Sequence, residues 1–154
     1  MREVFCIYIP KKYLRFEEGG FFLYKAEFWF SIPYSFNLIR DSKMHKISVM
    51  EKYYNMLKQG TKIIELRLFD NKRRSIKTGD VIEFSNESDI NDIFRAQVVK
   101  LHLADDFAAL CSEIDCKKAG FNTNQDLLKV LGEFYSLERQ KKWGVVGIEI
   151  KKID

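Results

Sequence analysis

The hydrophobic pattern of residues 60–84 predicts a strand that carries charged side chains on one face. Alternation divides the strand into two sets, Ile64, Leu66 and Leu68 on one face and Ile63, Glu65, Arg67 and Phe69 on the other. Burying the charges of Lys62, Glu65 and Arg67 costs desolvation energy, which their attraction offsets only when the hydrogen bonds are nearly ideal. This cost indicates a functional site. The alternative is a solvated surface pair that contributes little to stability.

A polar loop and a glycine turn follow this strand. Residues 70–75 include the consecutive cations Lys72, Arg73 and Arg74, and the turn at residues 77–80 leads into a predicted strand at 81–85. Three adjacent cations indicate either an ordinary solvated loop or a surface that follows a phosphate backbone.

Strand and helix patterns alternate through the rest of residues 44–154. Further strands are predicted at 46–49, 94–103 and 145–151. Helices are predicted at 51–59 before Gly60, from Asp105 and Asp106 to about 117–120, at 125–131 after a cap at 122–124, and from Ser136 to Lys142. Strands interrupted by helices, with a last strand that returns to the sheet, predict an α+β fold.

Composition places the chain among globular proteins, with 154 residues of which 46% are hydrophobic and 31% charged. The net charge of +4 is too small for a protein that coats nucleic acid with its whole surface, so any such contact is local. The three cysteines, Cys6, Cys111 and Cys116, form no C-x-x-C pair and favour a reducing compartment. We therefore expect a cytoplasmic location.

Residues 1–43 differ from the rest of the chain because they hold 12 of its 22 aromatic residues. Residues 21–39 approach the length of a membrane span, but Lys25, Glu27 and Pro33 oppose insertion, so we expect no membrane association. The segment also lacks a signal-peptide pattern. We interpret it as an aromatic-rich N-terminal extension. It is either an extra strand pair or, as we favour, not native, with Met44 as the alternative start.

The motifs of common cofactor chemistry are missing from the sequence. It contains no Walker A loop, dinucleotide glycine fingerprint, G-x-S-x-G elbow or H-E-x-x-H helix. His45 and His102 lie far apart without an accompanying ligand set, so no metal site is predicted. Cys111 falls on an apolar helical stripe and is interpreted as a core residue, and Cys116 as a helix-end thiol. We expect neither a metal nor a cofactor.

The strand, basic loop and glycine turn together resemble a known family. The pattern G-x-K-x-x-E-x-R-L-x-D-x-K-R-x-x-I-x-x-G-D-x-I-x-F, which runs from Gly60 to Phe84, is similar to that of the ASCH domain, the activating-signal-cointegrator homology domain of the PUA-like superfamily. Residues 134–138 and 144–150 resemble the closing segment of the same family. The resemblance covers residues 44–154 and implies a small PUA-like mixed β-barrel with helices covering it.

The resemblance also implies a charged cleft that binds RNA or a nucleotide, since the related PUA domains bind RNA. The arginine fork and the loop cations would contact phosphates, a carboxylate would select an amino group or a hydroxyl, and an aromatic ring would stack on a base. For Tyr135 and Trp143 the alternative is core packing. On this hypothesis the binding residues are Lys62, Glu65, Arg67, Lys72, Arg73, Arg74 and Tyr135.

A small hydrolase is the second hypothesis. Some small proteins of this fold are amidohydrolases that act on acetylated cytidine through a K-x-x-T-x-R arrangement, with the lysine as base and the threonine as nucleophile, and related proteins are associated with RNA cleavage. The matching stretch is residues 62–67, in which Glu65 replaces the threonine. Glu65 would then activate water, and Lys62 or Arg67 would stabilise the oxyanion. A role in protein interaction is the third alternative.

Overall fold

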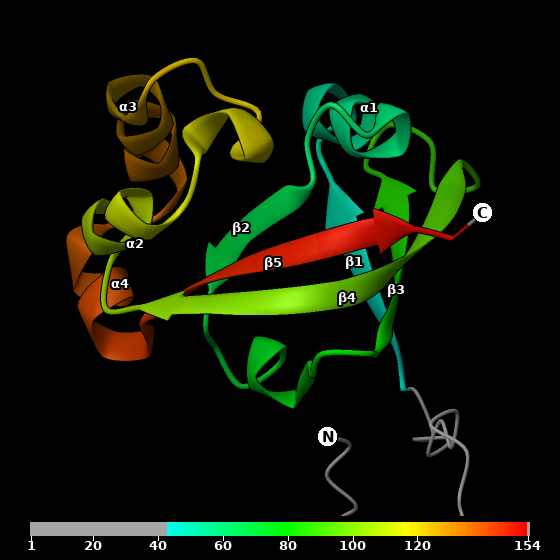
Figure 1. The fold of residues 1–154 in the computed structure, drawn as a ribbon, viewed down its shortest axis with the longest axis horizontal. Coiled ribbons are helices and arrows are strands. Elements are labelled where there is room, and N and C mark those ends of the chain that lie inside the picture. Colours follow the sequence, from blue (N-terminus) through cyan, green and yellow to red (C-terminus); the bar gives the residue numbers. More distant parts are fainter. Residues whose placement is uncertain (1–42, 154) are drawn as a thin grey trace, which may run out of the picture. The chain divides into compact units, whose positions relative to one another are not determined.

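The structure, a computed structural model, describes residues 43–153, so the expectations for residues 1–42 lie outside the described part. Five strands form one sheet in the order β1-β3-β4-β5-β2, in which only β1 and β3 are parallel (Figure 1). Their bounds are Met44–Val49, Ile64–Leu68, Val81–Asn86, Ile93–Ala104 and Val145–Lys152 for β1 to β5. The sheet curls into a half-barrel with helices packed against it. The predicted α+β fold with a small PUA-like mixed barrel is confirmed in this form.

Four α-helices are described, α1 at Glu51–Gln59, α2 at Phe107–Glu113, α3 at Asn124–Phe134 and α4 at Leu137–Trp143. Their ends follow the local chemistry of the sequence. Gly60 ends α1 with φ 78°, a left-handed conformation that favours glycine. The side chains of Thr123 and Ser136 cap α3 and α4 by accepting hydrogen bonds from Asp126 N and Arg139 N.

The predicted end of the second helix was wrong. α2 stops at Glu113, because Ile114 has an extended backbone, with φ −118° and ψ 153°. The Asp115 carboxylate then accepts a hydrogen bond from Lys117 N and starts a separate 3-10 turn, Cys116–Ala119, called η3. The apolar spacing alone had predicted one continuous helix, but the local cap at Asp115 starts a separate turn.

Two apolar clusters lie on opposite faces of the curled sheet. The barrel core occupies the inside and includes Ile47, Val49, Tyr54, Leu57, Ile82, Phe84, Phe94, Val146, Ile148 and Ile150. The outer core lies beneath α2 and α3 and includes Ile64, Leu66, Leu68, Phe107, Leu110, Cys111, Leu127, Leu131 and Val145. Burying one such side chain contributes about 1.5–3 kcal/mol. The sheet therefore supports a separate packed layer on each face.

The register of β2 determines where its charged side chains lie. Glu65 is paired with Ile148 and Arg67 with Val146 on the antiparallel neighbour β5. Residues directly opposite each other share a face of the sheet, and both partners belong to the barrel core. Glu65 and Arg67 therefore lie on the inner face of the half-barrel, and the alternation had predicted that they share a face.

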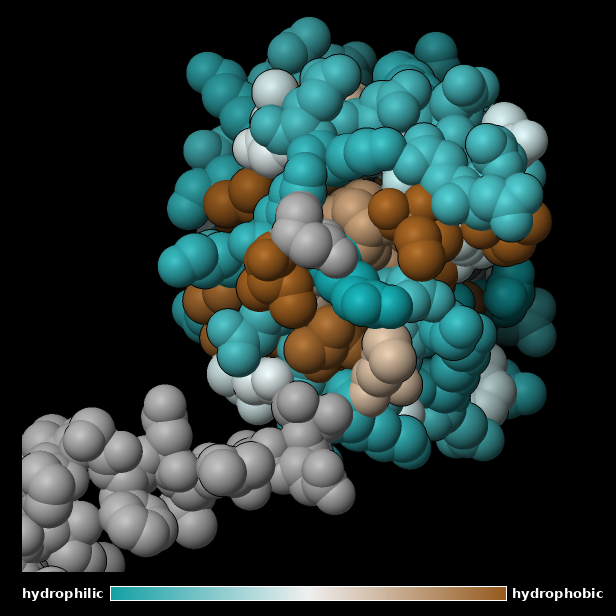
Figure 2. Space-filling model, turned by 90° about the vertical axis from the view of Figure 1, so that its right-hand side faces the viewer, coloured by the Kyte–Doolittle hydropathy of each residue, from teal (hydrophilic) through white to brown (hydrophobic). Residues whose placement is uncertain are grey.

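The surface of the described residues mixes polar and apolar side chains. Figure 2 shows one face, on which apolar patches lie among polar residues that surround them. Between residues 43 and 153, no helix is long and apolar enough to cross a membrane.

Candidate functional site

A pocket of about 260 Å³ lies beside the charged residues of β2. Its walls come from the end of β1, the start of α1, β2, the residue after β3, the loop before α3 and the end of α3. Its aromatic lining residues are Tyr53, Phe121, Phe134 and Tyr135. Its charged lining residues are Lys62, Glu65, Arg67 and Glu87. The pocket thus combines stacking surfaces with both signs of charge.

Lys62, Glu65 and Arg67 form a continuous chain of ion pairs on the pocket wall. Lys62 Nζ lies 3.3 Å from Glu65 Oε2, and Arg67 Nε lies 2.9 Å from Glu65 Oε1. The Arg67 N–H is not aimed well at that oxygen, so the second contact is an ion pair rather than a well-directed hydrogen bond. The side chains of Lys62 and Glu65 are only 3% and 6% exposed. A carboxylate is therefore held between two cations away from water.

The Lys62 ammonium is fixed from outside the strand as well. It donates a hydrogen bond of 2.9 Å to the carbonyl oxygen of Ala119 in η3. Gly120 follows with φ +86°, and a Cβ there would lie 3.3 Å from Lys62 Cδ. Burial lowers the pKa of Lys62, although the neighbouring Glu65 acts in the opposite direction. A buried lysine of this kind releases its proton more readily than one in water.

Arg67 connects the pocket to β1. Its Nη2 donates a hydrogen bond of 2.8 Å to the carbonyl oxygen of Ser48, and its guanidinium also bonds the Tyr135 hydroxyl. Burial alone would lower the pKa of Arg67, but Glu65 and Tyr135 outweigh it and the pKa is raised. Burial, together with Glu65 and Glu133, raises the pKa of Tyr53. Both residues therefore keep their protons at neutral pH.

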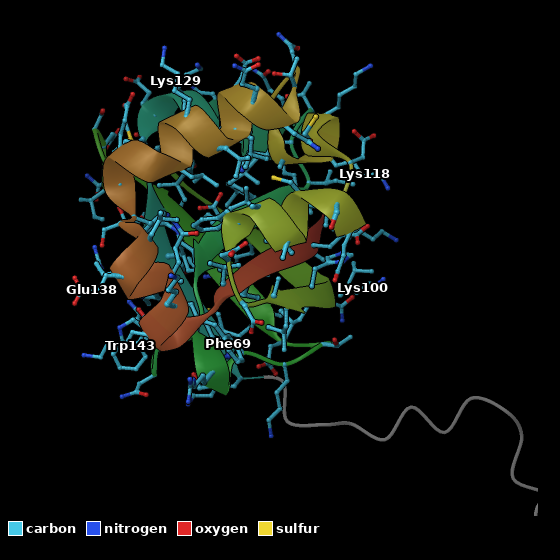
Figure 3. All side chains as sticks on the ribbon, turned by 90° about the vertical axis from the view of Figure 1, so that its left-hand side faces the viewer. Phe69, Lys100, Lys118, Lys129, Glu138 and Trp143 are labelled. Atoms are coloured by element: carbon cyan, nitrogen blue, oxygen red, sulfur yellow. The ribbon has the colours of Figure 1, made fainter. Side chains whose placement is uncertain are left out.

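The predicted cations of the basic loop do not line this pocket. The Arg73 guanidinium pairs with Asp70 at 2.9 Å. Arg74 donates to the carbonyl oxygen of Phe69 and lies over the rings of Phe69 and Trp143, which are neighbours in Figure 3. Of the predicted binding residues, the structure brings together Lys62, Glu65, Arg67 and Tyr135 and places Lys72, Arg73 and Arg74 elsewhere.

Several lining residues were not identified from the sequence. Tyr53 lies on α1, Phe121 in the loop before α3 and Phe134 at the end of α3. In sequence each is an ordinary aromatic residue of a helix face or a loop. Nothing in the local sequence marks them as pocket residues, although the structure leaves Phe134 47% exposed at the end of α3. The packing of distant segments brings these rings together.

The two histidines each lie beside a carboxylate, and Cys111 and Cys116 are free thiols. His45 Nε2 lies 2.8 Å from Asp80 Oδ2, and His102 Nε2 lies 2.9 Å from Glu149 Oε2. Within residues 43–153, no group of three or more His, Cys, Asp or Glu side chains could hold a metal ion. Cys111 lies in the outer core as predicted, and burial and the nearby Cys116 raise the pKa of its thiol.

Comparison with known structures finds the same fold in other proteins. The hypothetical protein PH0355 is 33% identical with a TM-score of 0.64, and the match covers 72% of this chain and 100% of that one. Protein PF0455 from Pyrococcus furiosus is 29% identical with a TM-score of 0.58, covering 73% and 99%. ASCH from Zymomonas mobilis is 14% identical with a TM-score of 0.51, covering 71% and 67%, and shows likeness of fold alone.

Comparison with sequence families agrees with the structural matches. No curated protein matches the chain. The family model of the ASCH domain matches residues 47–154, which include the pocket and the ion-pair chain of β2. The chain therefore belongs to the ASCH domain family.

Proposed function

We propose that the pocket binds a single unpaired nucleotide, either free or within an RNA strand. The observation that carries this proposal is a concave pocket with four aromatic lining residues and a buried Lys62–Glu65–Arg67 chain on one wall. Ligand pockets are typically concave and largely apolar, with a few fixed polar groups. A volume of about 260 Å³ is slightly below the usual range of about 300–1,000 Å³ and suits one base with its sugar.

Different polar groups of the pocket would contact different parts of a nucleotide. Glu65 accepts hydrogen bonds from an amino or hydroxyl group, and Lys62 donates to a base or to a 2′-hydroxyl. Arg67 brings positive charge to a phosphate, while its Nε and Nη2 face Glu65 and Ser48. A longer strand would continue over Lys72, Arg73 and Arg74 outside the pocket, where they remain the predicted backbone contacts. The proposal includes the cytoplasmic location expected from the cysteines.

Local contacts suit the charge distribution of this surface. The net charge of +4 is small, and the labelled lysines Lys100, Lys118 and Lys129 lie at separate places in Figure 3. Proteins that hold long stretches of backbone present clustered cations. Binding through one pocket is therefore better supported than binding along an extended surface.

Titration of a labelled single-stranded RNA octamer at several salt concentrations tests the proposal. Phe134→Ala removes a ring from the pocket rim and should weaken binding about tenfold, the effect of losing one stacking partner. Leu137→Ala is the matched control, because Leu137 is 69% exposed and does not line this pocket. Arg73→Ala should reduce the salt slope by about one unit. An octamer that does not bind, or that binds equally to both variants, contradicts the proposal.

A second candidate function is hydrolysis of modified nucleosides or RNA in the same pocket. The observation that favours it is the buried Lys62, whose pKa is lowered and which lies 3.3 Å from a carboxylate. Such a lysine releases its proton more readily than an exposed one, which suits proton transfer. Glu65 would orient or activate water beside it. Binding has more support, because the four aromatic lining residues suit a stacked base and need no reactive group.

Activity assays separate the two candidates. The purified full chain is incubated with acetylated cytidine and with RNA, and products are followed by chromatography. If hydrolysis occurs and Glu65→Gln abolishes it under conditions in which circular dichroism shows the variant to be folded, the enzyme hypothesis holds. An absence of turnover with an RNA that binds leaves binding as the function of the pocket.

A further inference from the structure

The main-chain groups of β2 alternate between two directions, and the hydrogen bonds at its two ends show which residues face which way. Ile150 N donates to Ile63 O, and Phe69 N donates to Gly144 O, so residues 63 and 69 bond to β5. Antiparallel pairs alternate between bonded and non-bonded positions. The odd-numbered residues of β2 therefore bond to β5. The main-chain groups of Ile64, Leu66 and Leu68 point away from β5, toward the free edge of the strand.

Leu66 is the one of these three that lines the pocket. The residue is only 4% exposed, and no hydrogen bond joins its edge-facing N–H and C=O to another residue of the described chain. Buried main-chain groups are almost always paired, so an open donor and acceptor at this position call for a partner. The pocket is the space that such a partner would occupy.

The pocket lies in the gap between the two edge strands of the half-barrel. β1 and β2 end the strand order, and Arg67 of β2 reaches the carbonyl oxygen of Ser48 in β1. The lining includes side chains from both faces of β2, Glu65 from the inner face and Leu66 from the outer face. A pocket bordered by both faces of a strand lies against the edge of that strand.

We propose that Leu66 reads the Watson–Crick edge of the bound base through its main-chain N–H and C=O. An edge residue of a strand offers its donor and acceptor together to one partner, as in a bonded antiparallel pair. Every nucleobase carries an adjacent donor and acceptor on its Watson–Crick edge, and single-stranded RNA leaves that edge free. The ring would lie roughly in the plane of the sheet, between the Glu65 side and the α3 side of the pocket.

This inference rests on the proposed nucleotide binding and makes it more specific. The ligand must be unpaired, because a partner strand would cover the edge that Leu66 contacts. The main-chain contact accepts every base, so preference among bases would come from the side chains Lys62, Glu65 and Glu87. Modification at the Watson–Crick edge would abolish recognition, whereas modification elsewhere on the ring would leave it unchanged.

Isomeric methylated RNAs provide the test. Single-stranded octamers of each base are titrated against the full chain, each beside two methylated versions. One version carries the methyl group on N1 of the purine or N3 of the pyrimidine, and the other carries it on C8 or C5. The uridine pair is the cleanest, since 3-methyluridine and 5-methyluridine have the same composition and charge. The first version should bind at least about tenfold more weakly than the second, because it loses a buried hydrogen bond.

The outcomes separate this inference from the proposed function. Equal affinity of the two isomers for every base that binds overturns the inference and leaves nucleotide binding intact. Failure of all unmodified octamers to bind overturns both. A second readout is the amide spectrum of ¹⁵N-labelled protein with the tightest-binding octamer. The Leu66 N–H signal should shift and become protected from exchange, whereas the Glu65 N–H, which bonds to β5, should stay protected with and without RNA. An unchanged Leu66 signal also overturns the inference.

Discussion

Two trios of the same composition lie in one sheet and differ in their surroundings. In the pocket trio, Glu65 lies between Lys62 and Arg67, whose side chains are 3% and 19% exposed. The surface trio has Glu83 between Lys46 and Arg95, at 3.0 and 3.1 Å, and these cations are 78% and 46% exposed. In each trio a lysine and an arginine hold one carboxylate. The residue types are therefore equal, and the two carboxylates are similarly buried, at 6% and 11% exposed, so the exposure of the cations makes the difference.

The two trios differ in the surroundings of the cations that remain when the carboxylate is removed. Exposed cations return to water at little cost, so surface ion pairs contribute little to stability. Buried cations lose their only counter-charge, and the cost of an uncompensated buried charge is several kcal/mol. A protein that maintains the pocket trio bears a desolvation cost that a surface pair avoids. This comparison supports a functional role for the pocket trio and a solvated role for the surface trio.

Replacing the central carboxylates gives the largest contrast. Glu65→Gln keeps the shape of the side chain but leaves Lys62 and Arg67 without a counter-charge, and it should lower the free energy of unfolding by about 3 kcal/mol. Glu83→Gln should change it little, because its partners lie in solvent. Urea unfolding followed by circular dichroism measures both. Equal losses in the two variants would mean that burial does not distinguish the trios.

The arginines are the next contrast, because Arg67 links the two edge strands β2 and β1, whereas Arg95 pairs across the adjacent strands β4 and β3. Arg67→Lys keeps the charge but loses the planar fork that reaches Ser48 O and Tyr135. We expect a loss of about 1–2 kcal/mol in the free energy of unfolding, together with faster amide exchange at Ser48 and Val49 in β1. Arg95→Lys is the matched control on the surface. If amide exchange in β1 does not change, Arg67 does not hold the edge strands together.

The lysines differ in the pH dependence that they confer, a smaller effect. Burial lowers the pKa of Lys62, so the unfolded chain holds this proton to a higher pH than the folded chain does. Between the lowered pKa and the ordinary value of 10.5, the unfolded state binds more protons and stability rises with pH. The stability difference between the wild-type protein and Lys62→Met should therefore grow in favour of the wild-type protein as pH rises.

Urea unfolding between pH 7 and pH 10 measures this trend. Lys46→Met is the control, because its ammonium is exposed and paired on the surface. Titration of tyrosines and other lysines affects all three proteins alike and cancels in the differences. A difference for Lys62→Met that stays constant across this range would show that burial does not perturb this lysine.

Local chemistry made much of the fold predictable. Alternation assigned Glu65 and Arg67 to one face of β2 and Leu66 to the other, because a strand has a strict period of two. The helix ends at Gly60, Thr123 and Ser136 followed from turn and cap residues. Such features depend on a few neighbouring residues. The error at α2 arose where a cap at Asp115 competed with a continuing apolar stripe.

Long-range packing made the pocket less predictable. Tyr53 and Phe134 face the charged strand only because α1 and α3 approach β2 from distant parts of the chain. Nothing in their local sequence separates a pocket wall from an ordinary helix face. The basic loop shows the opposite case, since Asp70 lies three residues before Arg73 and pairs with it. The sequence pattern predicted that Arg73 and Arg74 contact a ligand, but in the structure they bond to nearby residues of the chain.

The salt dependence of stability should also distinguish the two trios, although this is the smallest of the expected effects. Raising the ionic strength from 0.1 M to 1 M shortens the Debye length from about 10 Å to about 3 Å, which screens exposed charges far more than buried ones. Any stability difference between the wild-type protein and Glu83→Gln should disappear at high salt, whereas the difference for Glu65→Gln should persist. Parallel urea titrations at the two salt concentrations measure both differences. Loss of the Glu65→Gln difference at 1 M would place the pocket trio in contact with solvent ions, and the pocket would then be too open to hold a base away from water.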